Sequence, residues 1–261
     1  MKNKLKICMS FDDGRKDFYE YAFPILKKYN LTASFNVTTG YVDGSFKPNW
    51  KTSEGAVTEK ELSEMKDYGI EIAFHGDQHI TDIEDFKTSI NKMKKWNLLS
   101  KYMGFAVPGS YLKNVDIEKL KTFLKDNNII YMRVDNDKKC EKFFNKVYRK
   151  LYRITNISLF YSLYNKNNLF KKSDNYNVPS VIVFEKDSDK TLINFVKNNL
   201  SRNKNLVFMF HGILPKEHTN YGKDEYAWDL EKFDNFCKFL NQLKEKNKLD
   251  VVNLIDIIKE K

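Results

Sequence analysis

Short apolar runs alternate with segments of helical periodicity along almost the whole chain, and this alternation constrains the fold more than any other feature. The runs are rich in β-branched and aromatic residues, as are strands that are buried on both faces. Strands that alternate with amphipathic helices predict a parallel sheet covered by helices. About eight such units in 261 residues favour an α/β fold of the distorted (β/α)7–8 barrel type over an open sheet. The predicted strands are 5–11, 33–37, 70–74, 102–107, 129–134, 180–184, 206–210 and 250–254.

The composition predicts one large domain. Apolar residues make up 41% of the chain and aromatic residues 15%, which is enough to build a sizeable core. No Pro/Gly/Ser-rich linker divides the chain, so we expect a single domain over residues 1–261. Cys8, Cys140 and Cys237 are odd in number and far apart, which indicates neither a disulfide framework nor a CxxC metal site. Such cysteines fit a reducing compartment.

The hydrophobic runs also bear on location. Charged residues interrupt every run, so no stretch reaches the roughly 20 apolar residues that a membrane-spanning helix needs. The short apolar run at the N-terminus leads directly into Asp12 and Asp13 rather than into a small-residue cleavage site. The sequence therefore predicts a cytoplasmic protein that does not span a membrane.

The net charge of +10 is concentrated in one segment. Between Lys138 and Asn177 the chain carries ten Lys or Arg residues against Glu141 and Asp174, a balance of 10 − 2 = +8 that leaves about +2 for the rest. A charge confined to one place argues against a nucleic-acid partner. It indicates a basic, aromatic insertion at about residues 136–178.

The insertion is expected to contain an amphipathic helix, because apolar and basic residues repeat there with helical spacing on two different faces. One interpretation is a surface helix with a solvated charged side. The other is a dock, peripheral at the inner membrane face, for anionic lipid headgroups, a lipid-linked glycan or an acidic glycan. The apolar face comprises Phe144, Val147, Leu151 and Ile154, and the basic stripe comprises Lys142, Lys146, Arg149 and Arg153.

Side chains capable of metal binding and acid–base chemistry follow several predicted strands. Asp12 and Asp13 follow the first strand, His75 follows the third and His211 follows the seventh. A barrel brings the C-terminal ends of its strands to one mouth, so we expect these side chains to lie close together. His79 comes four residues after His75. A helical turn there would place the two imidazoles on one face.

These residues fit a catalytic metal site. Gly14 permits a sharp turn that directs Asp12 and Asp13 toward one cavity. One aspartate and two imidazoles would form a set of N and O ligands with open positions for water and substrate. The other aspartate would then be free to act as a base. The alternatives are two unrelated surface histidines and an aspartate that caps a helix.

Three segments resemble motifs of the polysaccharide deacetylase family (carbohydrate esterase family 4, the NodB homology domain). They read SFDDG at 10–14, GIEIAFHGDQH at 69–79 and FMFHG at 208–212. The resemblance implies a distorted (β/α) barrel and metal-dependent removal of an N- or O-linked acetyl group from a sugar. By position, it implies Asp12 as the catalytic base, His211 as the general acid, and Asp13, His75 and His79 as the metal ligands.

One feature of the family is missing. Many members carry an arginine in a motif resembling Arg-x-Pro-x-Gly, and the corresponding stretch here, GFAVPGSY, keeps Pro108 and Gly109 but has no arginine. We hypothesise that Arg133, near the end of the next strand, supplies a substitute charge to Asp12. The alternative is that Arg133 points outward into a surface salt bridge. Pro108, Gly109 and Tyr111 are expected to line the substrate-binding surface.

Trp228 follows a polar, Gly-containing loop just after His211. An aromatic ring near the mouth would stack on the face of a sugar, whereas a tryptophan at the start of a helix packs against the barrel. We include Trp228 among the candidate substrate-binding residues and keep both interpretations.

Taken together, these patterns predict a metal-dependent carbohydrate deacetylase with Asp12 as base and His211 as acid. Two imidazoles and one carboxylate favour Zn²⁺, although Co²⁺, Ni²⁺ and Fe²⁺ accept the same ligands. The expected partner is an acetylated carbohydrate. Two alternatives stay open: a deformylase or other amidohydrolase that acts on a non-polysaccharide amide, and a catalytically idle module that binds a glycan or a membrane.

Overall fold

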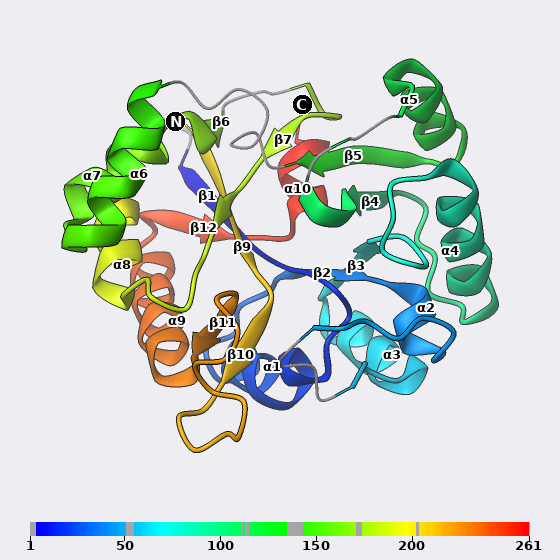
Figure 1. The fold of residues 1–261 in the computed structure, drawn as a ribbon, viewed down its shortest axis with the longest axis horizontal. Helices are drawn as coiled ribbons and strands as arrows, with labels where there is room; N and C mark the ends of the chain where they lie inside the picture. Colours follow the sequence, from blue (N-terminus) through cyan, green and yellow to red (C-terminus); the bar gives the residue numbers. More distant parts are fainter. Residues whose placement is uncertain are drawn as a thin grey trace.

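The computed structural model describes residues 4–50, 55–110, 112, 115–134, 143–170, 174–201 and 204–260. Within these residues, parallel strands form the centre of the protein and helices surround them (Figure 1). The strands follow one another in the order β9, β1, β2, β3, β4, β5 and β7, and each neighbouring pair is parallel. Their bounds are β1 (Leu5–Phe11), β2 (Ser34–Val37), β3 (Glu71–Phe74), β4 (Met103–Ala106), β5 (Ile129–Val134), β7 (Val178–Pro179) and β9 (Asn205–Phe210).

One short segment brings the two ends of this sheet together. Strand β7 pairs with β5, and β8 (Val181–Ile182) pairs in parallel with β9. Only Ser180 separates β7 from β8, so one stretch of chain bridges β5 and β9 at the two ends of the sheet. The predicted distorted (β/α)7–8 barrel is therefore confirmed as a nearly closed sheet in a single domain.

The helices predicted from periodicity are also confirmed. Several begin at a polar side chain that accepts hydrogen bonds from N–H groups of the first turn, such as Asp82, Asp116 and Asp229. Thr58 and Glu61 form a capping box. The helices are η1 (Phe18–Ala22), α1 (Phe23–Lys28), α2 (Thr39–Val42), α3 (Glu59–Tyr68), α4 (Ile83–Lys95), η2 (Pro108–Ser110), α5 (Ile117–Asp126), α6 (Phe143–Thr155), α7 (Ser158–Tyr164), η3 (Lys166–Asn168), α8 (Asp189–Lys197), α9 (Leu230–Glu245) and α10 (Leu254–Lys259).

Two further strands pair with the barrel strands from outside the ring. Strand β12 (Leu249–Val251) pairs with the first half of β1, and β6 (Leu169–Phe170) runs antiparallel beside β9. The expected eighth strand thus forms as β12, but it supports β1 instead of completing the ring, because β7 and β8 already join β5 to β9. Its last expected residue, Leu254, begins α10. A separate parallel pair, β10 (Gly212–Leu214) and β11 (Ala227–Asp229), follows the barrel.

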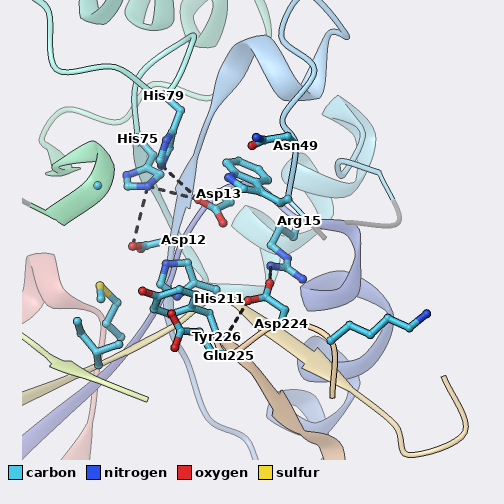
Figure 2. Close-up of a pocket in the computed structure, with 15 residues that line it drawn as sticks. Asp12, Asp13, Arg15, Asn49, His75, His79, His211, Asp224, Glu225 and Tyr226 are labelled. Carbon is cyan, nitrogen blue, oxygen red and sulfur yellow. Dashed lines mark hydrogen bonds and ion pairs between the residues drawn. The ribbon is translucent and has the colours of Figure 1, made fainter. Parts of the chain in front are cut away.

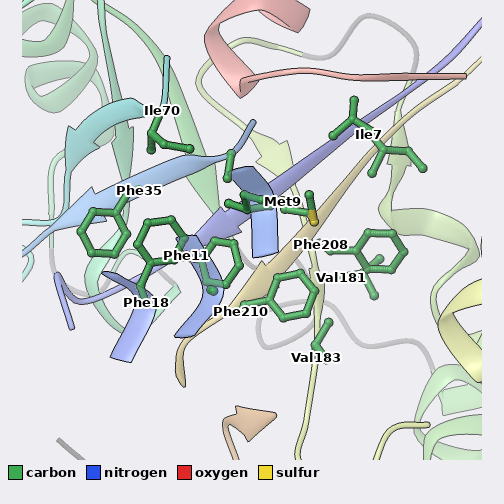
Figure 3. Close-up of a cluster of buried hydrophobic side chains, with 14 of the residues drawn as sticks. Ile7, Met9, Phe11, Phe18, Phe35, Ile70, Val181, Val183, Phe208 and Phe210 are labelled. Carbon is green, nitrogen blue, oxygen red and sulfur yellow. The ribbon is translucent and has the colours of Figure 1, made fainter. Parts of the chain in front are cut away.

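The apolar core lies between the barrel and its helices. Successive side chains of a strand point to opposite faces, and Ile7, Met9 and Phe11 occupy the same face of β1. They join Phe208 and Phe210 in one buried cluster (Figure 3). The rings of Phe11 and Phe210 are stacked with centroids 5.0 Å apart. Burying one such side chain contributes about 1.5–3 kcal/mol, so this face anchors β1 and the residues that follow it.

The other face of β1 points into the barrel and is polar toward the mouth. It carries Cys8, Ser10 and Asp12, all of them buried. The amide of Asn36 on β2 donates hydrogen bonds to Ser10 Oγ (2.9 Å) and Asp12 Oδ1 (2.8 Å). The inside of the barrel is therefore filled by a hydrogen-bonded network that leads to its open end.

Residues Phe143–Thr155, within the segment where an amphipathic helix is predicted, form α6, and α7 follows it. Residues 135–142, which include Lys142, lie outside the described residues. Tyr152 fastens α6 to the rest of the protein, since its hydroxyl donates a hydrogen bond to Asp187 Oδ1 at 2.8 Å. None of the helices in the described ranges has the length and apolar character needed to cross a membrane.

Candidate metal and catalytic site

Asp12 and Asp13 leave β1 at the mouth of the barrel. Asp13 has a φ of 81° and Gly14 a φ of 80°, so the chain turns sharply in the left-handed region. Glycine adopts this conformation readily, whereas an aspartate held there costs about 1–3 kcal/mol. Both carboxylates line the same cavity as a result, as the sequence predicts.

His75 and His79 are brought together by an irregular turn and not by the helical turn expected from their spacing. Gly76 has a φ of 81° and His79 a φ of 55°. The carboxylate of Asp85, on α4, accepts the backbone N–H groups of Asp77 and Gln78, each at 2.7 Å. In a regular helix these N–H groups would point along the helix axis instead. The hydrogen bonds to Asp85 therefore hold an irregular turn.

Gly76 is required for this arrangement. A Cβ atom at this position would lie 2.6 Å from Asp85 Oδ2, closer than real Cβ contacts. The positive φ of Gly76 adds a second reason why a larger residue would not fit. Asp85 can therefore approach the turn only because residue 76 lacks a side chain.

The two imidazoles face Asp13. His75 Nε2 and His79 Nε2 each lie 3.6 Å from Asp13 Oδ1 (Figure 2). One ligand atom from each of these three residues lies within 4.8 Å of the other two. His75 Nδ1 is 2.9 Å from the carbonyl oxygen of Ala106, which fixes Nδ1 as the N–H donor and leaves Nε2 with its lone pair toward Asp13.

This donor set fits a divalent cation. Bonds of about 2.0–2.2 Å to one metal would put neighbouring ligand atoms roughly 3.3 Å apart, close to the separations found here. A hydrogen bond from the second ring nitrogen of a ligating histidine to a carbonyl is the usual support for such a ligand, and His75 makes it. The predicted ligands Asp13, His75 and His79 are thus brought together by the fold.

The charges of these residues suit cation binding. Burial would raise the pKa of Asp13, but the nearby imidazoles of His75, His211 and His79 lower it well below its ordinary value. Burial and the neighbouring His75 lower the pKa of His79 to about 4. Burial also lowers the pKa of His75, but the negative charges of Asp12 and Asp13 outweigh this effect, so the pKa of His75 is raised. Asp13 is therefore ionised and His79 neutral near neutral pH, the forms that coordinate metals.

Arg133 lies inside the barrel and pairs with Asp12. Its Nη2 donates to both Asp12 Oδ1 and Oδ2 at 2.6 Å, and its Nη1 donates to Ser180 Oγ at 3.2 Å. Both Arg133 and Asp12 are 1% exposed. The outward salt bridge considered from sequence is therefore excluded. Burial would raise the pKa of Asp12, but Arg133, His75 and His211 outweigh it and lower that pKa below its ordinary value.

His211 follows β9 and contributes an imidazole to the same cavity. In Figure 2 it lies on the side of Asp12 away from His75 and His79. Its ring centroid is 4.9 Å from that of Tyr226. Its Nδ1 is buried and has no hydrogen-bond partner among the described residues. Burial lowers the pKa of His211 below its ordinary value.

These side chains surround a cavity of about 540 Å³. Arg15 is almost fully buried but forms part of the cavity wall. Its guanidinium is held by Asp17, which accepts from Nε at 3.0 Å and from Nη2 at 2.8 Å. Its Nη1 donates to Asp224 Oδ2 at 3.3 Å, which joins the loop after β1 to the loop that precedes β11. The other lining residues are Asn49, Trp50, Gly109, Ile182, Met209, Lys223, Glu225 and Tyr226.

The expected substrate-binding residues divide into three cases. Gly109 lines the cavity, while Pro108 is buried beside it. Tyr111 lies outside the described residues. Trp228 is 0% exposed, and its Nε1 donates to the carbonyl of Asp187 at 2.8 Å. Its inclusion as a sugar-stacking residue is wrong, because this residue of β11 packs into the core against Phe210 and Phe236.

Several residues of the site were not anticipated from sequence. Asn36 and Arg15 are buried polar residues within or just after apolar strands, a signal that could have marked them. Trp50 lines the cavity with its ring 5.3 Å from that of His79, but it lies in a segment without periodicity. Asp85 belongs to the polar pattern of an ordinary amphipathic helix, so its role in the turn was not visible in the sequence.

An Asp/His/His ligand set at the C-terminal end of parallel strands places the protein among the (β/α)-barrel proteins with a candidate metal site at the mouth. Comparison with protein families gives one match, over less than half of the chain. Residues 2–105 match the family model for polysaccharide deacetylase. This match spans the first two of the three motifs, and it confirms the resemblance that they indicate. Comparison with curated proteins gives no match.

Solved structures show the same fold over nearly the whole chain. One is the Xyl-CE4 domain of a multidomain xylanase from the hindgut metagenome of Trinervitermes trinervoides, with a TM-score of 0.50, 12% identity, and coverage of 99% of this chain and 91% of that one. Another is the catalytic domain of peptidoglycan N-acetylglucosamine deacetylase from Eubacterium rectale, with a TM-score of 0.51, 15% identity, and coverage of 96% and 89%. A third is a CE4 family pseudoenzyme from Bacillus anthracis, with a TM-score of 0.51, 12% identity, and coverage of 100% and 67%.

Proposed function

We propose that this protein is a metal-dependent carbohydrate deacetylase that hydrolyses an N- or O-linked acetyl group. The observation that carries the proposal is the convergence of Asp13, His75 and His79, whose ligand atoms lie within 4.8 Å of one another, beside the ion-paired carboxylate of Asp12. A purely structural role for Asp12 would not explain why three potential cation ligands lie beside it. The family match over residues 2–105 supports the same activity.

Asp13, His75 and His79 would hold the cation, and Zn²⁺ is the ion we propose for two imidazoles and one carboxylate. A divalent ion supplies Lewis-acid chemistry, since it polarises a carbonyl oxygen and acidifies water. The remaining work of the reaction falls to side chains of the chain itself.

Asp12 accepts the proton of the attacking water in this proposal. Arg133 and Asn36 hold its carboxylate from inside the barrel, the first through Nη2 at 2.6 Å and the second through Nδ2 at 2.8 Å. A base fixed by three hydrogen bonds cannot rotate away from the mouth. Arg133 thus acts as a positioning residue for the base, in place of the arginine that the GFAVPGSY stretch lacks.

His211 donates a proton to the departing nitrogen or oxygen of the sugar. It sits on a different strand from Asp12, which separates the group that takes a proton from the group that gives one. Its burial lowers the imidazole pKa, which makes the protonated ring a stronger acid. The cavity of about 540 Å³ has room for a sugar unit that carries the acetyl group.

The test measures acetate released from N-acetylated and O-acetylated oligosaccharides by protein loaded with Zn²⁺. We expect Asp12→Asn to lower turnover by about 10²–10⁴-fold, because the base is lost while the carboxamide keeps the shape of the side chain. Metal content, measured on the same samples, should stay stoichiometric in Asp12→Asn and fall in Asp13→Ala.

Glu217→Gln is the matched control, since it removes an exposed carboxylate that does not line the cavity, and it should leave turnover unchanged. Stoichiometric metal without acetate release from any acetylated sugar would contradict the proposal and favour a binding module. Release of formate, but not acetate, from acylated amines would assign the site to a deformylase.

A further inference from the structure

Helices α6 and α7 carry most of the large apolar side chains that the described part of the chain exposes. Among the described residues seven such side chains are exposed; four of them lie in these two helices and a fifth, Ile157, in the link between them. A gathering of exposed apolar side chains commonly marks an interaction site. The five are Phe144 (66% exposed), Val147 (36%), Ile154 (71%), Ile157 (49%) and Leu159 (61%).

The orientation of α6 accounts for this exposure. Asn145 and Tyr152, seven residues apart, are each only 7% exposed and form the side that packs on the protein. Tyr152 uses its hydroxyl there, in the hydrogen bond to Asp187. The apolar stripe that begins at Phe144 and ends at Ile154 therefore faces outward. In most surface helices the apolar side is the one that packs on the core, so α6 is reversed.

Basic residues lie beside the apolar stripe. Lys146, Lys150 and Arg153 are exposed on α6, and no Asp or Glu occurs between residues 143 and 170. Figure 1 places α6 and α7 at the outer edge of the molecule, opposite α4. The surface thus combines positively charged side chains with exposed apolar ones.

We propose that this outer face of α6 and α7, defined by Phe144, Val147, Ile154, Ile157 and Leu159 with Lys146 and Lys150, binds the surface of an anionic lipid bilayer. An apolar stripe next to a basic stripe is the pattern by which amphipathic helices lie in the plane of a membrane surface. A second copy of the chain is disfavoured as the occupant, because two faces without a single carboxylate would repel each other. The inference goes beyond the proposed reaction and does not depend on it.

In the bound state the apolar side chains enter the boundary between headgroups and acyl chains, and the lysines contact lipid phosphates. Each basic residue near an anionic leaflet strengthens binding about five-fold at low ionic strength. Binding should consequently weaken as salt is raised and should need both kinds of side chain.

Flotation of the full chain with vesicles tests this directly. We expect the protein to float with vesicles of phosphatidylglycerol and phosphatidylcholine, and not with phosphatidylcholine alone. The apolar variant Ile154→Ser/Leu159→Ser should bind at least about ten-fold more weakly, because both side chains are exposed and leave the folded core intact. Ile117→Ser, at an exposed apolar position on α5, is its matched control and should bind as the parent does.

The charge variant Lys146→Gln/Lys150→Gln should bind about 25-fold more weakly at low salt. Its matched control, Lys94→Gln/Lys95→Gln, removes the same charge from α4 and should have little effect if the surface is local. Equal losses in the two pairs would mean that only the net charge of the protein matters, which would overturn the proposal.

Insertion itself can be followed with Ile154→Trp. The added indole should shift its emission to shorter wavelength on anionic vesicles and be quenched by lipids brominated on their acyl chains. Failure of the parent protein to float with anionic vesicles would refute the inference, as would unchanged binding of the apolar variant. A dimer that dissociates in Ile154→Ser/Leu159→Ser, seen by analytical ultracentrifugation, would assign the face to a second copy instead.

Discussion

Two buried carboxylates occupy opposite ends of the same barrel, and their surroundings differ. At the base, Glu71 accepts hydrogen bonds from the hydroxyls of Ser34 (2.5 Å) and Tyr131 (2.9 Å) and from the N–H of Ile255 (3.1 Å). At the mouth, Asp12 is held by the guanidinium of Arg133. One carboxylate is thus solvated by neutral donors and the other is paired with a charge.

The difference decides the ionisation of the two groups. Burial raises the pKa of Glu71, and its neutral donors offset that only in part. At Asp12, burial acts in the same direction but is outweighed by Arg133 and the nearby imidazoles, so the pKa is lowered. Glu71 ties β3 to β2, β5 and α10, which is a structural task. Asp12 is kept as an anion beside the three residues proposed to hold the cation, which fits the proposed role in catalysis.

The largest effect is expected at the charged end. Arg133→Met leaves the buried charge of Asp12 without its partner, and we expect a loss of about 3–5 kcal/mol in the free energy of unfolding. Urea unfolding in the presence of a chelator measures this without a contribution from bound metal. Arg133→Lys keeps the charge but not the two-pronged contact and should recover part of the loss.

The double variant Asp12→Asn/Arg133→Met supplies the control for this pair. It removes both charges, so it should be more stable than Arg133→Met alone. Equal stability of the single and double variants would show that the pair is not coupled and that the contrast between the two ends of the barrel is mistaken.

A smaller effect is expected from the support of the histidine turn. Asp85→Asn loses one of the two acceptors that hold the N–H groups of Asp77 and Gln78. Because this turn sets the position of His79 beside His75, we expect the affinity for Zn²⁺ to fall about 10–100-fold by calorimetric titration. Activity need not be assayed.

Asp82→Asn is the matched control for Asp85→Asn. Asp82 caps the same helix, α4, but does not contact the turn between the two histidines. Its replacement should leave metal affinity unchanged. Parallel losses of affinity in both variants would indicate a general disturbance of α4 rather than a role for the Asp85 carboxylate.

The smallest effect is expected at the base of the barrel, and it depends on pH. The folded protein raises the pKa of Glu71 above its ordinary value of 4.5, so the contribution of Glu71 to stability is full below that pH and is lost as the pH rises through the folded pKa. Glu71→Gln does not ionise. The stability of the parent relative to Glu71→Gln should therefore decrease as the pH rises, by about 1 kcal/mol or less for each pH unit.

Urea unfolding of both proteins over this pH range measures the difference. A relative stability that increases with pH would mean that Glu71 is ionised and paired in the folded state, as Asp12 is. Glu71 at the base and Asp12 at the mouth would then have the same ionisation state in the folded protein. Acetate release should be the same in Glu71→Gln and the parent, since Glu71 does not line the cavity.

Much of the fold follows from local patterns in the sequence. The apolar runs predicted the barrel strands, and helical periodicity predicted the helices between them. The convergence of Asp13, His75 and His79 was also predicted, because residues at the C-terminal ends of parallel strands meet at one mouth. Periodicity and strand ends are local properties, so they can be deduced without knowing which strands are neighbours.

The tertiary structure decided what depends on residues distant in sequence. Arg133 could have faced inward or outward until the pairing of β4, β5 and β7 directed its side chain to Asp12, 121 positions earlier. Trp228 was a plausible surface ring until α9 packed it into the core. The amphipathic pattern of α6 was clear from the sequence, yet which side of the helix would pack on the protein was not.

The sequence by itself therefore determined the order of strands and helices and which polar residues gather at the mouth of the barrel. Only the tertiary structure determined the partner of the base, the acceptor that holds the histidine turn, and the outward orientation of the apolar side of α6. The physical reason is that a strand or helix repeats with a fixed period, whereas the face that becomes buried is chosen by packing energies summed over segments from the whole chain.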